Sequence, residues 1–152
     1  MSLTLEIKGL DKLKEQFAKA PQIVLQEINP AIQKSIILLH RLAGQKVPVD
    51  LGFLGGAEAM KTELSNLRGT LKNTAKYAKA VHDGTRPHWI PIDAITPWAN
   101  RHGIPPFLVA RSIARKGTKA HPFFSDAIRD GQREIDSLFE KALNNIANKL
   151  AK

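Results

Sequence analysis

Hydrophobic and polar positions alternate at the start of the chain. Leu3, Leu5 and Ile7 are each separated by a single polar residue, and Gly9 follows. Strict alternation of this kind is typical of a half-buried strand, because successive side chains of a strand point to opposite faces. The pattern therefore predicts an edge strand that ends at Gly9.

The spacing of apolar residues then becomes helical. Leu10, Leu13 and Phe17 share one helix face, and Pro21 is expected to interrupt this short helix. A longer helix is predicted from about Gln22 to Lys46. Its apolar stripe advances in steps of three and four residues through Leu25, Ile28, Ile32, Ile36, Leu39 and Ala43.

The dipeptide Asn29-Pro30 falls inside this second helical pattern. Either Asn29 caps a new helix that has Pro30 at its first position, or Pro30 kinks one long helix. The cap is favoured, because the N–H that proline lacks has no helical partner at a first position. The helix is expected to close at Val47-Pro48-Val49-Asp50.

The centre of the chain is rich in turn residues. The glycine-rich segment from Leu51 to Gly56 predicts a mobile loop. Residues 60–74 predict a hairpin with its turn at residues 66–69, and the expected strand residues are Leu64, Leu67 and Leu71.

Three helices are predicted in the second half of the chain. Two short ones span Ile92–His102 and Pro106–Lys116, each followed by a glycine in the left-handed conformation, Gly103 and Gly117. The last helix begins at Pro122 and runs to the end. Its expected apolar stripe is Phe124, Ile128, Gly131, Ile135, Leu138, Ala142, Ile146 and Leu150.

Together these elements predict an α+β fold. A small antiparallel sheet, made of the N-terminal strand and the central hairpin, packs with long N-terminal and C-terminal helices. The 152 residues fit one domain, from 1 to 152.

Charge is concentrated in the middle of the chain. The net charge is +9, and residues 64–125 carry ten Lys or Arg but only two acids, Asp83 and Asp93. A basic region of this kind attracts nucleic acid or an acidic protein surface. The chain has no cysteine, which excludes disulfides and thiolate chemistry. No signal peptide is expected, and the apolar run Ile36–Leu39 is too short to span a membrane.

Three segments of the sequence carry a family resemblance. They are Val47-Pro48-Val49-Asp50-Leu51-Gly52-Phe53-Leu54, Tyr77-Ala78-Lys79-Ala80-Val81-His82-Asp83-Gly84-Thr85-Arg86-Pro87-His88, and Lys116-Gly117-Thr118-Lys119-Ala120-His121-Pro122-Phe123-Phe124. In this order they resemble the tail-completion, or head–tail joining, proteins of long-tailed bacteriophages and prophages. The resemblance implies a structural virion protein that is one subunit of a homo-oligomeric ring and contacts other neck or tail proteins. It also implies location in the virion, after assembly in the cytoplasm of the host bacterium.

Candidate chemistry is sparse. His82, His88, His102 and His121 lie in the basic middle, but their spacing matches no zinc motif, so no metal or cofactor is expected. The sequence contains no nucleophile elbow and no phosphate-binding loop, and an enzyme is not expected.

Nucleic-acid binding is the alternative function. Basic residues with aromatic residues between them would contact phosphates and stack on bases. This set comprises Arg86, Arg101, Arg111, Arg115, Lys116 and Lys119 with Trp89, Trp98 and Phe107. The competing interpretation is that Trp98 and Phe107 are core residues of the short helices and the basic residues are their solvated faces.

A binding function places the important residues on contact surfaces. We expect these at the glycine-rich loop, at the turn after Thr85 and in the basic stretch before the last helix. The candidate contact residues are Phe53, Arg86, His88, Trp89, Lys116, Lys119 and His121.

Overall fold

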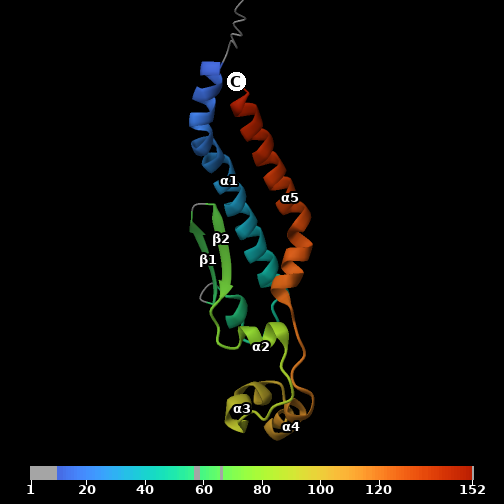
Figure 1. The fold of residues 1–152 in the computed structure, drawn as a ribbon. Coiled ribbons are helices and arrows are strands. Elements are labelled where there is room, and N and C mark those ends of the chain that lie inside the picture. The colour runs from blue at the N-terminus through green and yellow to red at the C-terminus, as the bar shows by residue number, and fades with distance from the viewer. Residues whose placement is uncertain (1–9, 57–58, 66, 152) are drawn as a thin grey trace, which may run out of the picture. The chain divides into compact units, whose positions relative to one another are not determined.

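The computed structural model describes residues 10–56, 59–65 and 67–151. The predicted strand at Leu3–Ile7 lies outside these residues. The fold is α+β, with a two-stranded antiparallel sheet and long N-terminal and C-terminal helices, as predicted (Figure 1). The elements in chain order are α1 (Leu10–Lys46), the 3-10 helix η1 (Phe53–Gly55), β1 (Met60–Ser65), β2 (Arg68–Asn73), α2 (Ala78–Asp83), α3 (Ile92–Arg101), α4 (Pro106–Lys116) and α5 (Phe123–Leu150).

The chain forms two compact units. Unit 1 comprises Met1–His40, Thr62–Leu71 and Asp130–Lys152, and unit 2 comprises Arg41–Lys61 and Lys72–Arg129. Both long helices and the hairpin contribute residues to each unit.

In unit 1, α1 and α5 lie side by side (Figure 1). The carboxylate of Glu27 on α1 accepts hydrogen bonds from Asn145 (2.9 Å) and Lys149 (2.6 Å) on α5. Ile36 on α1 and Ile146 on α5 are buried, as their places in the two predicted stripes require. The two amphipathic faces therefore supply the apolar core of unit 1.

Helix α1 is continuous through both of its prolines. The predicted interruption at Pro21 and the favoured cap at Asn29 are therefore wrong. The side chain of Asn29 does not cap α1; its Oδ1 accepts the backbone N–H of Leu67 in the hairpin turn (3.1 Å). Proline removes one helical hydrogen bond, and burial of a long apolar stripe offsets that local cost.

The predicted hairpin is present, and it packs on α1 within unit 1. The prediction of Leu67 as a strand residue is wrong: it lies in the turn with a left-handed backbone (φ 56°). Gly69, predicted in the turn, lies in β2. A Cβ added to Gly69 would lie 2.5 Å from Ile36 and 2.8 Å from Ile32. Glycine at this position therefore allows β2 to approach the α1 backbone closely.

The apolar stripe of α5 is confirmed from Gly131 onward. Before it, Phe124 is half-buried, in keeping with the stripe, but Ile128 does not belong to the buried face. Phe123 and Ala127 are buried in the first two turns, whereas Ile128 is exposed. The buried face changes because these turns belong to unit 2 and pack on different neighbours from the rest of the helix.

Helices α3 and α4 match their predicted bounds to within one residue and pack against each other. Ala99 on α3 and Ala110 on α4 are fully buried. Gly117 does end α4, but its backbone (φ 72°, ψ −162°) is not the left-handed helical conformation that was predicted. No helix among the described residues is long and apolar enough to cross a membrane.

Candidate functional site

Two Gly-Thr dipeptides, 33 residues apart in sequence, pair with each other in unit 2. The N–H of Thr85 donates to the carbonyl of Thr118, and the N–H of Thr118 donates to the carbonyl of Thr85, both at 3.2 Å. The hydroxyl of Thr118 also donates to the hydroxyl of Thr85 (3.1 Å). This antiparallel bridge joins two of the segments that carry the family resemblance, and we call it the Gly-Thr clasp.

Gly84 and Gly117 are needed for the clasp on two counts. Gly84 (φ 70°, ψ 179°) and Gly117 (φ 72°, ψ −162°) adopt a backbone conformation that is essentially restricted to glycine. A Cβ on Gly84 would lie 2.6 Å from the carbonyl oxygen of Thr118, and a Cβ on Gly117 would overlap the carbonyl oxygen of Thr85. Each glycine therefore leaves space for the backbone of the opposing segment of the clasp.

The clasp joins the two ends of the segment that contains α3 and α4. Residues 86–117, which we call the clasped lobe, leave at Thr85 and return at Thr118 with α3 and α4 between. Within the lobe, the N–H of His88 donates to the carbonyl of Ile113 (3.4 Å). The guanidinium of Arg101 forms an ion pair with Asp50, which ties the lobe to the segment after α1. This pairing lowers the pKa of the Asp50 carboxyl.

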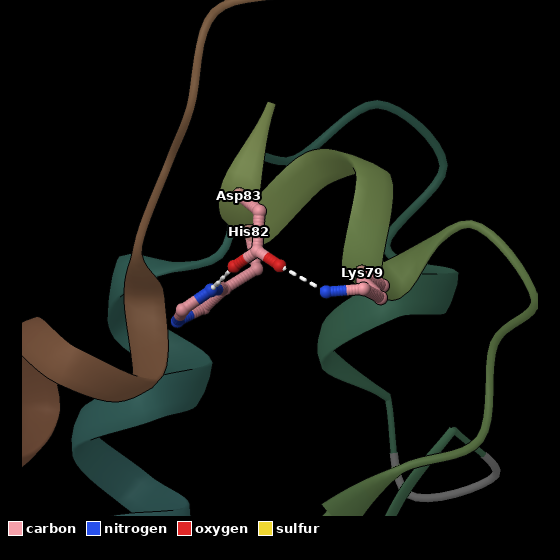
Figure 2. Close-up of polar contacts among 3 residues, drawn as sticks. All are labelled: Lys79, His82 and Asp83. Carbon is pink, nitrogen blue, oxygen red and sulfur yellow. Dashed lines mark hydrogen bonds and ion pairs between the residues drawn. The ribbon is translucent and has the colours of Figure 1, made fainter. Parts of the chain in front are cut away.

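A charged group lies immediately before the clasp (Figure 2). The carboxylate of Asp83 accepts hydrogen bonds from Lys79 Nζ and from His82 Nδ1, each at 2.5 Å. These contacts lower the pKa of Asp83, chiefly through the Lys79 ammonium and then through His82. They also raise the pKa of Lys79. The three side chains fix the end of α2, where Gly84 turns the chain into the clasp.

The ring of His82 covers the start of α5. It packs edge-on against Phe123 with ring centroids 5.1 Å apart, and the N–H of His121 donates to the carbonyl of Val81 (2.9 Å). His82 Nε2 is buried and has no hydrogen-bond partner among the described residues. A cavity of about 240 Å³ beside this ring is lined by Asn73, Ala78, Lys79, His82, Asp83, Phe123 and Phe124.

The Asp83 carboxylate is bound by Lys79 and His82, and the cavity has polar lining residues as well as the apolar Ala78, Phe123 and Phe124. No group of three or more metal-ligating side chains occurs in the part of the chain that the structure describes.

The structure brings most of the predicted contact residues to the clasp and the clasped lobe. Arg86 follows Thr85, and Lys116 and Lys119 flank the Gly117-Thr118 pair, all with exposed side chains. His121 is also exposed, although its backbone N–H is used in pairing.

His88 and Trp89 open the clasped lobe, and both are exposed. The Nδ1 atom of His88 lies 2.9 Å from the carbonyl oxygen of Arg86. Trp89 is 57% exposed and contacts Phe107, with ring centroids 6.5 Å apart. Phe107 itself is 53% exposed, so its interpretation as a core residue is wrong. Trp98 is half-buried and stacks on His102 at 4.1 Å.

Phe53 lies in a different segment of unit 2. The predicted mobile loop contains the 3-10 helix η1, in which Leu54 is buried and its carbonyl accepts a hydrogen bond from the Asn73 side chain (2.7 Å). Phe53, Leu51 and Val49 remain exposed. The segment is therefore anchored at one residue and presents its other apolar side chains to solvent.

The sequence did not predict the clasp or the contact between Trp89 and Phe107. The repeated Gly-Thr dipeptide was a signal for the clasp, but nothing local shows that the two copies face each other. The exposure of Phe107 depends on which faces of α3 and α4 pack against each other, and apolar periodicity alone does not show that.

Comparisons with protein-family models, curated proteins and solved structures give no match.

Proposed function

We propose that this chain is a structural virion protein of a tailed bacteriophage or prophage. In this role it joins head and tail, or completes the tail, as one subunit of an oligomeric ring that contacts other neck or tail proteins. It has no catalytic role, and it assembles in the host bacterial cytoplasm before it becomes part of the virion.

The observation that carries the proposal is the Gly-Thr clasp. Two segments of the resemblance, far apart in sequence, pair residue to residue through Thr85 and Thr118. A chance similarity of separate turn motifs gives no reason for them to meet. Their pairing supports a common structural device, of the kind that a family pattern of turns would preserve.

Exposed apolar side chains support a role in binding. Val49, Leu51 and Phe53 are exposed on one segment of unit 2, and Trp89 and Phe107 on another. Contiguous apolar surface on a soluble protein commonly marks an interaction site. A subunit whose work is assembly would cover such surface in the particle.

Disruption of the gene in the phage or inducible prophage that carries it tests this function. We expect filled heads and separate tails in electron micrographs of the lysate, and restoration of joined particles by the wild-type gene in trans. Joined, infectious particles at normal titre without the gene would contradict the proposal.

Contact variants separate assembly from folding. Arg86→Ala and Lys119→Ala alter exposed residues, for which stability changes usually stay within about 0.5 kcal/mol. Each variant should melt like the wild type yet restore fewer joined particles. Loss of the thermal transition in Arg86→Ala would instead assign that residue to folding.

Nucleic-acid binding is the second candidate, and the excess of basic residues in the clasped lobe favours it. If the lobe contacts phosphates, affinity for duplex DNA should fall steeply with salt, by roughly 0.9 log units per tenfold salt increase for each phosphate neutralised. We expect only weak, sequence-independent binding. Tight, sequence-selective binding at physiological salt would favour this alternative.

A further inference from the structure

The clasped lobe and the two residues that follow it, Thr118 and Lys119, are strongly basic. Residues 86–119 contain one acid, Asp93, and six basic residues, which are Arg86, Arg101, Arg111, Arg115, Lys116 and Lys119. Arg101 is paired with Asp50. Arg111 and Arg115 lie one turn apart on α4, and both side chains are exposed. The lobe therefore presents positive charge to solvent.

The same lobe exposes apolar surface. Trp89 and Phe107 contact each other while each leaves more than half of its surface in solvent. Leu108 and Ile104, close to Phe107 in the chain, are exposed as well. A partner for this surface must supply both negative charge and apolar side chains.

The outer face of α5 in unit 1 carries both negative charge and an exposed apolar side chain. Residues 130–140 contain one basic residue, Arg133, and four acids, which are Asp130, Glu134, Asp136 and Glu140. Asp136, Glu140 and Leu143 follow one another in steps of four and three, so they share a helix face. Leu143 is 58% exposed, and the two acids are exposed. Leu143 lies beside the buried stripe that contains Ala142 and Ile146, and Asp136 and Glu140 lie farther round the helix from it.

We propose that the clasped lobe of one copy docks on the outer face of α5 in a second copy. Arg111 and Arg115 would meet Asp136 and Glu140, and Leu143 would pack on the aromatic pair. Because the two surfaces differ, the contact is heterologous, and repetition with a suitable rotation closes a ring. This inference rests on the proposed function, for which it names the self-association surfaces.

A second copy fits these surfaces better than nucleic acid does. Nucleic acid would use the basic residues and could stack on Trp89, but it would leave the acidic and apolar face of α5 unused. A second copy uses both surfaces, and their opposite charges favour encounter in one orientation.

Charge reversal in trans tests the contact. The lobe variant carries Arg111→Glu and Arg115→Glu, and the helix variant carries Asp136→Lys and Glu140→Lys. Sedimentation velocity of the full chain at low and physiological salt measures self-association. Each variant alone should associate roughly 100-fold more weakly than the wild type, because like charges then face each other.

An equal mixture of the two variants should regain self-association. In the mixture, the lobe of each variant meets an α5 face of opposite charge on the other variant. Recovery also shows that both variants are folded, which a loss of association alone does not. Wild-type chains that remain monomeric at all concentrations would overturn the proposal, as would a mixture that does not recover.

Duplex DNA is the control ligand. If DNA binding is lost in the lobe variant, unaffected in the helix variant, and not accompanied by wild-type self-association, the lobe is a nucleic-acid surface and the proposal is overturned. Failure of the contact between the lobe and α5 can be told apart from failure of the proposed function. Monomeric wild-type protein that nevertheless restores joined particles refutes only this contact, whereas self-association without any effect on particles refutes only the virion role.

Discussion

At the scale of single residues, the most constrained positions are the two glycines of the clasp. Both Gly84 and Gly117 combine a positive φ with a carbonyl oxygen where a Cβ would be. Gly103 has a similar φ of 65° but open space around it. This contrast separates the conformational requirement for glycine from the requirement for space.

Gly117→Ala should lower the free energy of unfolding by about 3 kcal/mol or more, because backbone strain adds to the overlap with Thr85. Gly103→Ala should cost only about 1 kcal/mol, the cost of a positive φ alone. Urea denaturation of the two variants measures the difference. Equal destabilisation would mean that close approach at the clasp is unimportant.

The lowered pKa of Asp83 predicts that the stability of the folded chain depends on pH. Its contacts with Lys79 and His82 lower its pKa in the folded state below the ordinary value of about 3.9. The unfolded state therefore binds the proton more readily, so the contribution of Asp83 is full at neutral pH and is lost as pH falls through the folded-state pKa.

Asp83→Asn should accordingly be less stable than the wild type at neutral pH, and the difference should shrink as pH falls below the ordinary pKa of about 3.9 and vanish below the folded-state pKa. Lys79→Gln, which removes the main cause of the lowered pKa, should show a weaker pH dependence than the wild type. Thermal melting across this pH range measures both effects. A difference between Asp83→Asn and the wild type that grows on acidification would contradict the assignment.

At the scale of elements, α5 divides into two stretches with different buried faces. Phe123 and Ala127 are buried in unit 2, and the stripe through Ala142 and Ile146 is buried in unit 1. Leu143, next to that stripe, is exposed. The same helix therefore carries two large aliphatic residues, Ile146 in the core and Leu143 in solvent.

Ile146→Ala should cost about 2–5 kcal/mol of unfolding free energy, because it leaves a cavity in the core of unit 1. Leu143→Ala should stay within about 0.5 kcal/mol. Thermal or chemical denaturation compares the two. If Leu143→Ala were the more damaging change, the assignment of the buried and exposed faces would be reversed.

The elements that sequence predicted well are those with strong local signals. Gly103 and Gly117 marked the ends of α3 and α4, and turn residues marked the hairpin. The break expected at Pro30 did not occur, because partial or full burial of apolar residues on both sides of it, such as Ile28 and Ile36, outweighs one lost hydrogen bond. Residues such as Arg86 and Lys119 were identified as exposed contact candidates, but their convergence at one clasp depends on pairing across 33 residues. No periodic pattern encodes that pairing.

At the scale of the whole molecule, charge and apolar exposure define how the chain would assemble. The exposed side chains around η1, which are Val49, Leu51 and Phe53, have Leu54 as their buried anchor. In an assembly they should be covered, because exposed apolar surface is otherwise left in water.

Chymotrypsin should therefore cut at Leu51 or Phe53 in the isolated subunit, and the same sites should resist cleavage in assembled particles. Peptide mapping by mass spectrometry identifies the cut. Tyr77, also exposed, serves as an internal reference site. Equal protection of the η1 segment in both states would argue against its burial on assembly.

The protein composition of purified particles tests the central claim most directly. Particles produced by the phage or prophage that encodes the chain can be banded in a density gradient and quantified by mass spectrometry against a single-copy virion protein. The proposed function predicts that the chain is present in a fixed, small number of copies per particle, retained through a high-salt wash. Absence from the particles, with the chain recovered only on nucleic acid in the host lysate, would contradict a structural role in the virion.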